Sequence, residues 1–205
     1  MTLQRLRTIL WVVAGLAALA GLVIALRPMP ADAPIASSGS LSEIGGPFTL
    51  TGTDGKAFSS EQLAGKPYVL FFGFTHCPDV CPTTLARLAR LRTALGKGDD
   101  SFAIVLISVD PDRDTPAEMA RYAGLFGTPV IALTGTTAAI ERVKKQFGAY
   151  SAKVPQAGAD YTVDHTASVL LIDRNGKFSA TISPGEGDHA ARAKLERLVK
   201  DGSAP

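Results

Sequence analysis

The stretch that decides the fold reads FFGFTHCPDVCPTTL and runs from Phe71 to Leu85. It begins with apolar residues typical of a buried strand and continues into residues that suit the first turns of a helix. Cys77 and Cys81, the two cysteines of the chain, lie where the strand gives way to the helix. Because unpaired N–H groups at a helix N-terminus favour thiolate over thiol, this position predicts cysteines that are reactive or bind a metal.

The sequence around this stretch predicts alternating strands and helices. Continuous apolar runs predict buried strands at 68–74 and 102–109, with a shorter strand at 130–133. Helical spacing of apolar residues, cap residues and closing glycines predict four helices, at 80–95, 116–126, 137–147 and 189–200. Asp-Gly and Asn-Gly pairs predict two hairpins, with strands at 48–51 and 56–58 and at 166–173 and 177–182. This order predicts an α/β sheet covered by helices, in a domain from residue 47 to 205.

With two thiols at the junction between a central strand and its helix, this order resembles the thioredoxin fold. The resemblance is one of topology and motif position, and it implies a thioredoxin-like domain. In such a sheet, the loop before the strand at 166–173 lies beside the thiol-bearing turn. We therefore expect His165, which lies just before this strand and after a predicted loop at 149–159, to approach the cysteines.

The N-terminus predicts a membrane anchor. Residues 1–7 carry arginines and no acid, and form a cytoplasmic segment, whereas 8–26 is apolar and just long enough to cross a bilayer. A cleaved signal peptide is the alternative, but the apolar run exceeds the usual length of one. Residues 27–46, rich in proline, predict a flexible spacer. We expect a single-pass protein of a bacterial inner membrane, with the domain in the periplasm or on the outer face.

Composition limits the remaining classes of function. The chain has 205 residues with 46% hydrophobic and 20% charged residues, which is typical of a packed globular protein. A formal net charge of +2 without a basic block argues against nucleic-acid binding. Two cysteines are too few for a disulfide scaffold, although the expected compartment is oxidising and permits a disulfide between them.

Three interpretations of the cysteine pair are open from the residues themselves. The first is a structural disulfide, and the second is a redox pair in a thiol-disulfide oxidoreductase, weakened because the spacer is one residue longer than in C-x-x-C. The third is two thirds of a soft-metal site that His165 completes. Two thiolates and an imidazole suit copper, whereas structural zinc normally takes four protein ligands.

Three separated motifs resemble the Sco/SenC family. They are FTHCPDVCP at 74–82, SVDPDRDTP at 108–116 and YTVDHT at 161–166, in this order along the chain. The resemblance implies a membrane-anchored copper metallochaperone that binds Cu(I) or Cu(II) through Cys77, Cys81 and His165. It further implies that the protein assists assembly of the copper A centre of cytochrome c oxidase. The expected partners are the oxidase subunit that carries that centre, a copper donor protein and a thiol reductant. The alternative is an enzyme, a thiol-disulfide oxidoreductase that reduces the cysteines of an oxidase subunit or of another exported protein.

Other candidate residues are weaker. His76 adjoins Cys77 but should point away from it, and His189 should lie on the surface. The acids at 110, 112 and 114 do not fit a calcium loop, since position six is Thr115 and position twelve is Arg121; Asp114 or Thr115 should instead cap the next helix. Asp79 and Asp164 are candidates for supporting the metal ligands or for facing a partner. A thiol peroxidase is disfavoured because no activating arginine is evident near the cysteines.

Overall fold

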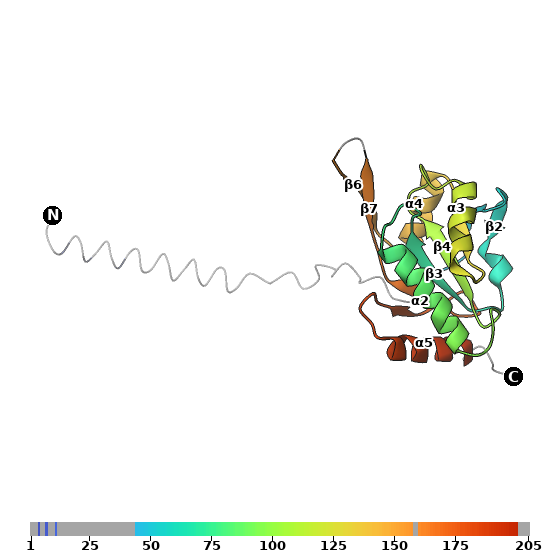
Figure 1. Ribbon diagram of the computed structural model, residues 1–205. Helices are drawn as coiled ribbons and strands as arrows, with labels where there is room; N and C mark the ends of the chain where they lie inside the picture. Colours follow the sequence, from blue (N-terminus) through green and yellow to red (C-terminus); the bar gives the residue numbers. More distant parts are fainter. Residues whose placement is uncertain (1–3, 5–6, 8–10, 12–43, 158–159, 201–205) are drawn as a thin grey trace. The chain divides into compact units, whose positions relative to one another are not determined.

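The structure is a computed structural model that describes residues 4, 7, 11, 44–157 and 160–200 (Figure 1). Contacts divide the chain into two units, Met1–Ser38 and Gly39–Pro205, and the description below concerns the second. None of the helices formed by the described residues is both long and apolar enough to cross a membrane. The predicted anchor at 8–26, apart from Trp11, and the spacer up to residue 43 lie outside the described residues.

A seven-stranded sheet forms the centre of the domain. Its strand order is β2-β1-β5-β4-β3-β8-β9. The two central strands, β3 and β4, are parallel and buried at every residue, as their continuous apolar sequences predict. The strand bounds are β1 Thr49–Gly52, β2 Ala57–Ser59, β3 Tyr68–Gly73, β4 Ala103–Ser108, β5 Ile131–Thr134, β8 Val169–Ile172 and β9 Phe178–Ile182.

In the part of the domain that the structure describes, four α-helices and two 3-10 turns lie between or after these strands. The helices are α2 Val80–Ala94, α3 Pro116–Ala123, α4 Thr137–Gln146 and α5 Asp188–Lys200, and the turns are η2 Ser60–Leu63 and η3 Gly124–Phe126. In α2, the predicted apolar face is buried at Leu85, Leu88 and Leu91. Thr115 caps α3 by accepting a hydrogen bond from the backbone N–H of Glu118, so Thr115 and not Asp114 is the cap.

The predicted loop at 149–159 is wrong in part, because residues 151–155 belong to a second, two-stranded sheet. Strand β6 (Ser151–Pro155) pairs antiparallel with β7 (Tyr161–His165), and the two form a hairpin that extends from the domain (Figure 1). Both strands have only five residues and β6 shows no clean apolar alternation, so pattern alone did not reveal the hairpin. His165 therefore ends a strand, and β8 begins later than predicted, at Val169.

Candidate metal centre

Cys77 and Cys81 are both free and lie on either side of the start of α2. Cys77 belongs to the connection after β3, where its N–H donates to the Phe74 carbonyl at 3.3 Å. Cys81 is in the first helical turn and is fully buried. Its backbone N–H donates to the Cys77 Sγ at 3.3 Å, so the helix N-terminus is directed at the Cys77 sulfur.

His165 reaches the cysteines from the end of β7. Its Nδ1 lies 3.1 Å from the Thr166 carbonyl oxygen, which assigns the proton to Nδ1 and leaves Nε2 as the electron-pair donor. Nε2 is 3.5 Å from the Cys81 Sγ. The rings of Phe71 and Phe74 meet the imidazole edge-on, each with its centroid 5.8 Å away, and restrict its rotation.

Three potential ligand atoms thus converge from two separate parts of the chain. The two Sγ atoms and a nitrogen of His165 all lie within 4.8 Å of one another. Cys77 and His165 are partly exposed, whereas Cys81 is buried beneath them. An ion could therefore approach from the side of Cys77 and His165, with the buried Cys81 beneath it.

The environment of the two thiols shifts their pKa values in opposite directions. The hydrogen bond donated by the Cys81 thiol is the main cause that lowers the pKa of Cys77 to about 4, and the contacts from His165 and from the backbone N–H groups of Cys81 and Asp79 act in the same direction. The same hydrogen bond, together with burial, raises the pKa of Cys81. The pair therefore holds one thiolate at neutral pH, at the more exposed sulfur.

We expect the alkylation rate of Cys77 in the metal-free reduced protein to be nearly independent of pH from about pH 5 to pH 8. An ordinary thiol is only about 0.3% ionised at pH 6, so its rate should rise about tenfold for each pH unit in this range. The pH profile is a better measure than the absolute rate, because a low pKa also lowers the intrinsic nucleophilicity. Iodoacetamide labelling followed by peptide mass spectrometry gives both rates, and the unfolded protein is the reference. A tenfold rise per pH unit at Cys77 in the folded protein would contradict the lowered pKa.

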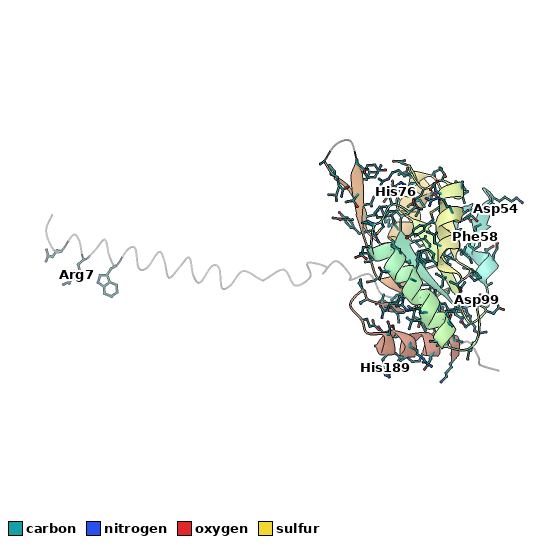
Figure 2. All side chains as sticks on the ribbon, viewed as in Figure 1. Arg7, Asp54, Phe58, His76, Asp99 and His189 are labelled. Atoms are coloured by element: carbon teal, nitrogen blue, oxygen red, sulfur yellow. The ribbon has the colours of Figure 1, made fainter. Side chains whose placement is uncertain are left out.

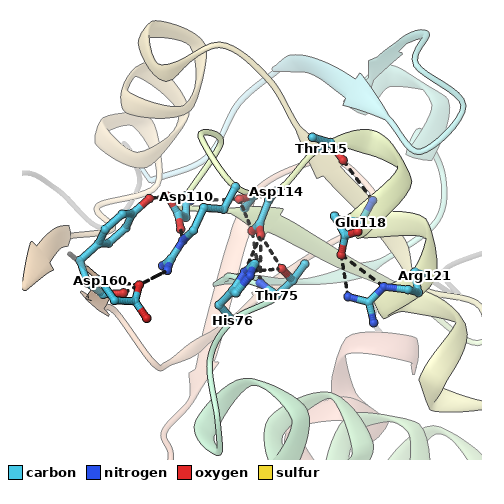
Figure 3. A network of polar contacts seen from close by, with 11 residues as sticks. Thr75, His76, Asp110, Asp114, Thr115, Glu118, Arg121 and Asp160 are labelled. Carbon is cyan, nitrogen blue, oxygen red and sulfur yellow. Dashed lines mark hydrogen bonds and ion pairs between the residues drawn. The ribbon is translucent and has the colours of Figure 1, made fainter. Parts of the chain in front are cut away.

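The other two histidines lie away from this group of ligand atoms. His76 is exposed, and its Nδ1 lies 3.0 Å from the Thr75 Oγ1 and 3.9 Å from the Asp114 carboxylate (Figure 3). His189 is exposed in the first turn of α5, and Figure 2 shows the two histidines well separated on the domain. The expectation that His76 points away from Cys77 and that His189 lies on the surface is confirmed.

The acids after β4 serve a different purpose from the one that calcium-loop spacing suggests. Asp110 and Asp114 are fully buried and accept hydrogen bonds from other side chains, including Thr75 and Tyr161 (Figure 3). Sequence reasoning missed this network. A signal was available, since residues following two neighbouring parallel strands, here β3 and β4, meet at the same edge of the sheet.

Asp79 and Asp164 do not contact the ligand atoms through their carboxylates. The Asp79 Oδ1 accepts a hydrogen bond from the Thr83 Oγ1 at 3.1 Å, while the Asp79 N–H faces the Cys77 sulfur. Asp164 is exposed on β7, next to His165. Both carboxylates are thus placed to face solvent or a partner.

Comparison with known proteins identifies relatives over most of the chain. The SCO1/SenC family model matches residues 36–200. The SCO2-like protein RP587 of Rickettsia prowazekii is 38% identical over 138 residues, which are 66% of this chain and 67% of that protein. The chain spans only about half the length of the mitochondrial SCO2 and SCO1 proteins of Saccharomyces cerevisiae that it also matches.

Solved structures agree with this assignment. The copper-bound structure of ScoI from Bradyrhizobium japonicum is 44% identical and has a TM-score of 0.69, with 76% of this chain and 99% of that chain covered. BsSco, described as a member of the Sco family of cytochrome c oxidase assembly proteins, is 26% identical with a TM-score of 0.61, covering 78% of this chain and 95% of that chain. The predicted thioredoxin-like α/β domain is confirmed. The chain belongs to the SCO1/SenC family.

Proposed function

We propose that this protein binds a single copper ion through Cys77, Cys81 and His165. The observation that carries the proposal is the convergence of two sulfurs and an imidazole nitrogen within 4.8 Å. Thiolate and imidazole are soft and borderline ligands that suit Cu(I) and Cu(II). The copper-bound relative from Bradyrhizobium japonicum supports the choice of metal.

The charges of the three ligands suit a protein that transfers its metal. Two thiolates and a neutral imidazole give a neutral site with Cu(II) and one negative charge with Cu(I). Neither oxidation state leaves a large uncompensated charge beside the buried Cys81. The partly exposed Cys77 and His165 allow a partner's ligands to approach the ion from outside.

We further propose that the recipient is the copper A centre of cytochrome c oxidase. The description of BsSco as a cytochrome c oxidase assembly protein supports this assignment. On this proposal, residues 8–26 anchor the chain in the inner membrane with the domain on the outer face. A copper donor protein and a thiol reductant then complete the cycle, since both cysteines must be reduced before loading.

Metal analysis of the purified, reduced protein tests copper binding. We expect one equivalent of copper and, after oxidation to Cu(II), a sulfur-to-copper charge-transfer band. Cys77→Ser and Cys81→Ser should each lose most of the bound copper, since the hydroxyl of serine is a hard and weakly acidic replacement for a thiolate. Copper that stays bound in both variants, or Cu(II) without the charge-transfer band, would rule out thiolate ligation.

A second candidate function is thiol-disulfide exchange with an exported protein. It is favoured by the pairing of a partly exposed Cys77, whose pKa is lowered to about 4, with a buried Cys81 of raised pKa. This is the arrangement of an attacking and a resolving thiol. Strongly weakened Cu(II) binding in His165→Ala with thiol-disulfide exchange intact would separate the two functions.

A further inference from the structure

We propose that the loop at 108–114, here called the bracket loop, positions both halves of the metal centre. The cysteine half is the turn that carries Cys77 and Cys81, and the histidine half is strand β7, which carries His165. It lies between β4 and α3 and contacts the cysteine-bearing turn on one side and strand β7 on the other. The measurements of copper affinity that test this inference rest on the proposed copper site, whereas the measurements of amide hydrogen exchange described below need no metal. Its residues are positioning residues, because none of them contributes one of the three ligand atoms.

Asp114 holds the cysteine half. Its carboxylate is fully buried and accepts hydrogen bonds from the Thr75 N–H at 3.2 Å and the Thr75 hydroxyl at 2.6 Å. Thr75 lies inside the turn that the hydrogen bond from the Cys77 N–H to the Phe74 carbonyl closes. Figure 3 shows the contact between Thr75 and Asp114. Fixing Thr75 therefore fixes the direction in which the chain continues from the end of β3 to Cys77.

Asp110 and Arg113 hold the histidine half. The Tyr161 hydroxyl donates to the Asp110 carboxylate at 2.8 Å, and the Arg113 guanidinium lies 3.8 Å from the centroid of the Tyr161 ring. Arg113 also donates to the Tyr161 carbonyl at 3.0 Å. Tyr161 opens β7 and His165 closes it, about 13 Å away at ~3.3 Å per residue. The contact thus sets the direction of the whole strand relative to the sheet.

The two contacts belong to one rigid turn. The Asp114 N–H donates to the Asp110 carbonyl at 2.9 Å. Ser108, the last residue of β4, joins them further, since its hydroxyl donates to the Asp114 carboxylate at 2.6 Å and accepts from the Asp110 N–H at 3.0 Å. A shift of Asp114 therefore also shifts Asp110. The cysteine half and the histidine half of the metal centre are thus both held by the same turn.

Burial of these acids is not explained by stability alone. The cost of removing a carboxylate from water must be compensated by hydrogen bonds. Apolar residues of similar volume would stabilise the edge of the sheet equally well. Burial raises the pKa of Asp114, which reflects this cost. Ser108 supplies one of the donors that compensate it, and the others come from Thr75 in the ligand-bearing turn, where a fixed geometry affects metal affinity directly.

The cysteine half is tested with Asp114→Asn and, from the other side of the contact, Thr75→Val. We expect each to speed amide hydrogen exchange in residues 74–81 and to weaken copper binding about 10- to 100-fold, as is typical when groups that orient a metal ligand are removed. Thr75→Val keeps the size of the side chain and leaves Asp114 itself in place, so it remains informative if Asp114→Asn fails to fold. Thr75→Ser keeps the hydroxyl and should restore both values.

The histidine half is tested with Tyr161→Phe, which removes one hydroxyl and retains the stacked ring. We expect faster exchange in residues 161–166, unchanged exchange in 74–77, and a shifted Cu(II) charge-transfer band. Glu118→Gln is the matched control, because it breaks an exposed ion pair with Arg121 on the adjacent helix and touches neither half (Figure 3). It should leave exchange and spectrum unchanged.

The outcomes separate this inference from the proposed function. If the wild-type protein binds no copper, the proposed function fails, and the exchange measurements alone decide the bracket loop. Amide hydrogen exchange that becomes faster only in residues 74–81 or only in residues 161–166 supports the inference. For residues 74–81, Thr75→Ser should restore the wild-type rate. Exchange that stays at the wild-type rate in Thr75→Val and in Tyr161→Phe, or that rises equally across the whole domain, would overturn the inference.

Discussion

Replacement of His165 by alanine is expected to weaken Cu(II) binding at least about 100-fold, since loss of a ligand should cost no less than loss of the groups that orient one. The remaining two sulfurs can still hold Cu(I), which accepts low coordination numbers with soft ligands. Cu(I) affinity should therefore fall less than Cu(II) affinity. The thiols should still exchange with disulfides, because Cys77 retains its hydrogen bonds from Cys81 and from the helix N-terminus.

Competition titrations with a chromophoric chelator measure both affinities, and reduction of a small disulfide measures exchange. His189→Ala is the control, since it removes an exposed histidine in the first turn of α5. His76→Ala tests the neighbouring histidine and should leave Cu(II) affinity unchanged, because its ring faces Thr75 and Asp114. An unchanged Cu(II) affinity in His165→Ala would show that the site has another third ligand.

The parts of the fold that sequence predicts well are those that local pattern determines. Strands β3 and β4 are buried on both faces, so each is a continuous apolar run that cannot be confused with a surface segment. The observed start of α2 at Val80 agrees with the predicted helix at 80–95, and Pro82 suits its first turn, where a backbone N–H has no intrahelical partner. The two cysteines could therefore be placed at the junction of β3 and α2 from sequence.

The parts that escaped prediction depend on contacts between distant segments. Strand β7 contains strand-forming residues, but it is only five residues long, and its partner strand β6 (SAKVP) carries little strand signal, so the hairpin that positions His165 was not predicted. The pairing of Asp114 with Thr75, 39 residues apart, has no local signature at all. His165 could be predicted as a ligand from topology, but the restraint of its strand by Tyr161 and Arg113 required the structure.

Replacement of Gly73 by alanine is expected to destabilise the domain and to disturb the metal centre together. Gly73 ends β3, and a Cβ atom there would lie 2.9 Å from Phe71, 3.0 Å from the Cys81 Sγ and 3.2 Å from Leu106. All three side chains are fully buried, so none can move aside into solvent. Overpacking of a core costs about 1–3 kcal/mol. At about 2–4 °C per kcal/mol for a domain of this size, thermal unfolding should detect the change.

The effect on copper should exceed what lost stability explains, because the closest atoms include a proposed ligand. A Cβ at Gly73 would displace the Cys81 Sγ, which lies 3.5 Å from the His165 Nε2 in the native arrangement. Gly124→Ala is the matched control, since that glycine has a φ of −65° and open space around its Cβ position. It should keep native copper affinity and gain up to about 1 kcal/mol of stability from a less flexible unfolded chain. Equal copper affinities in folded Gly73→Ala and Gly124→Ala would mean that the close approach at Gly73 serves packing alone.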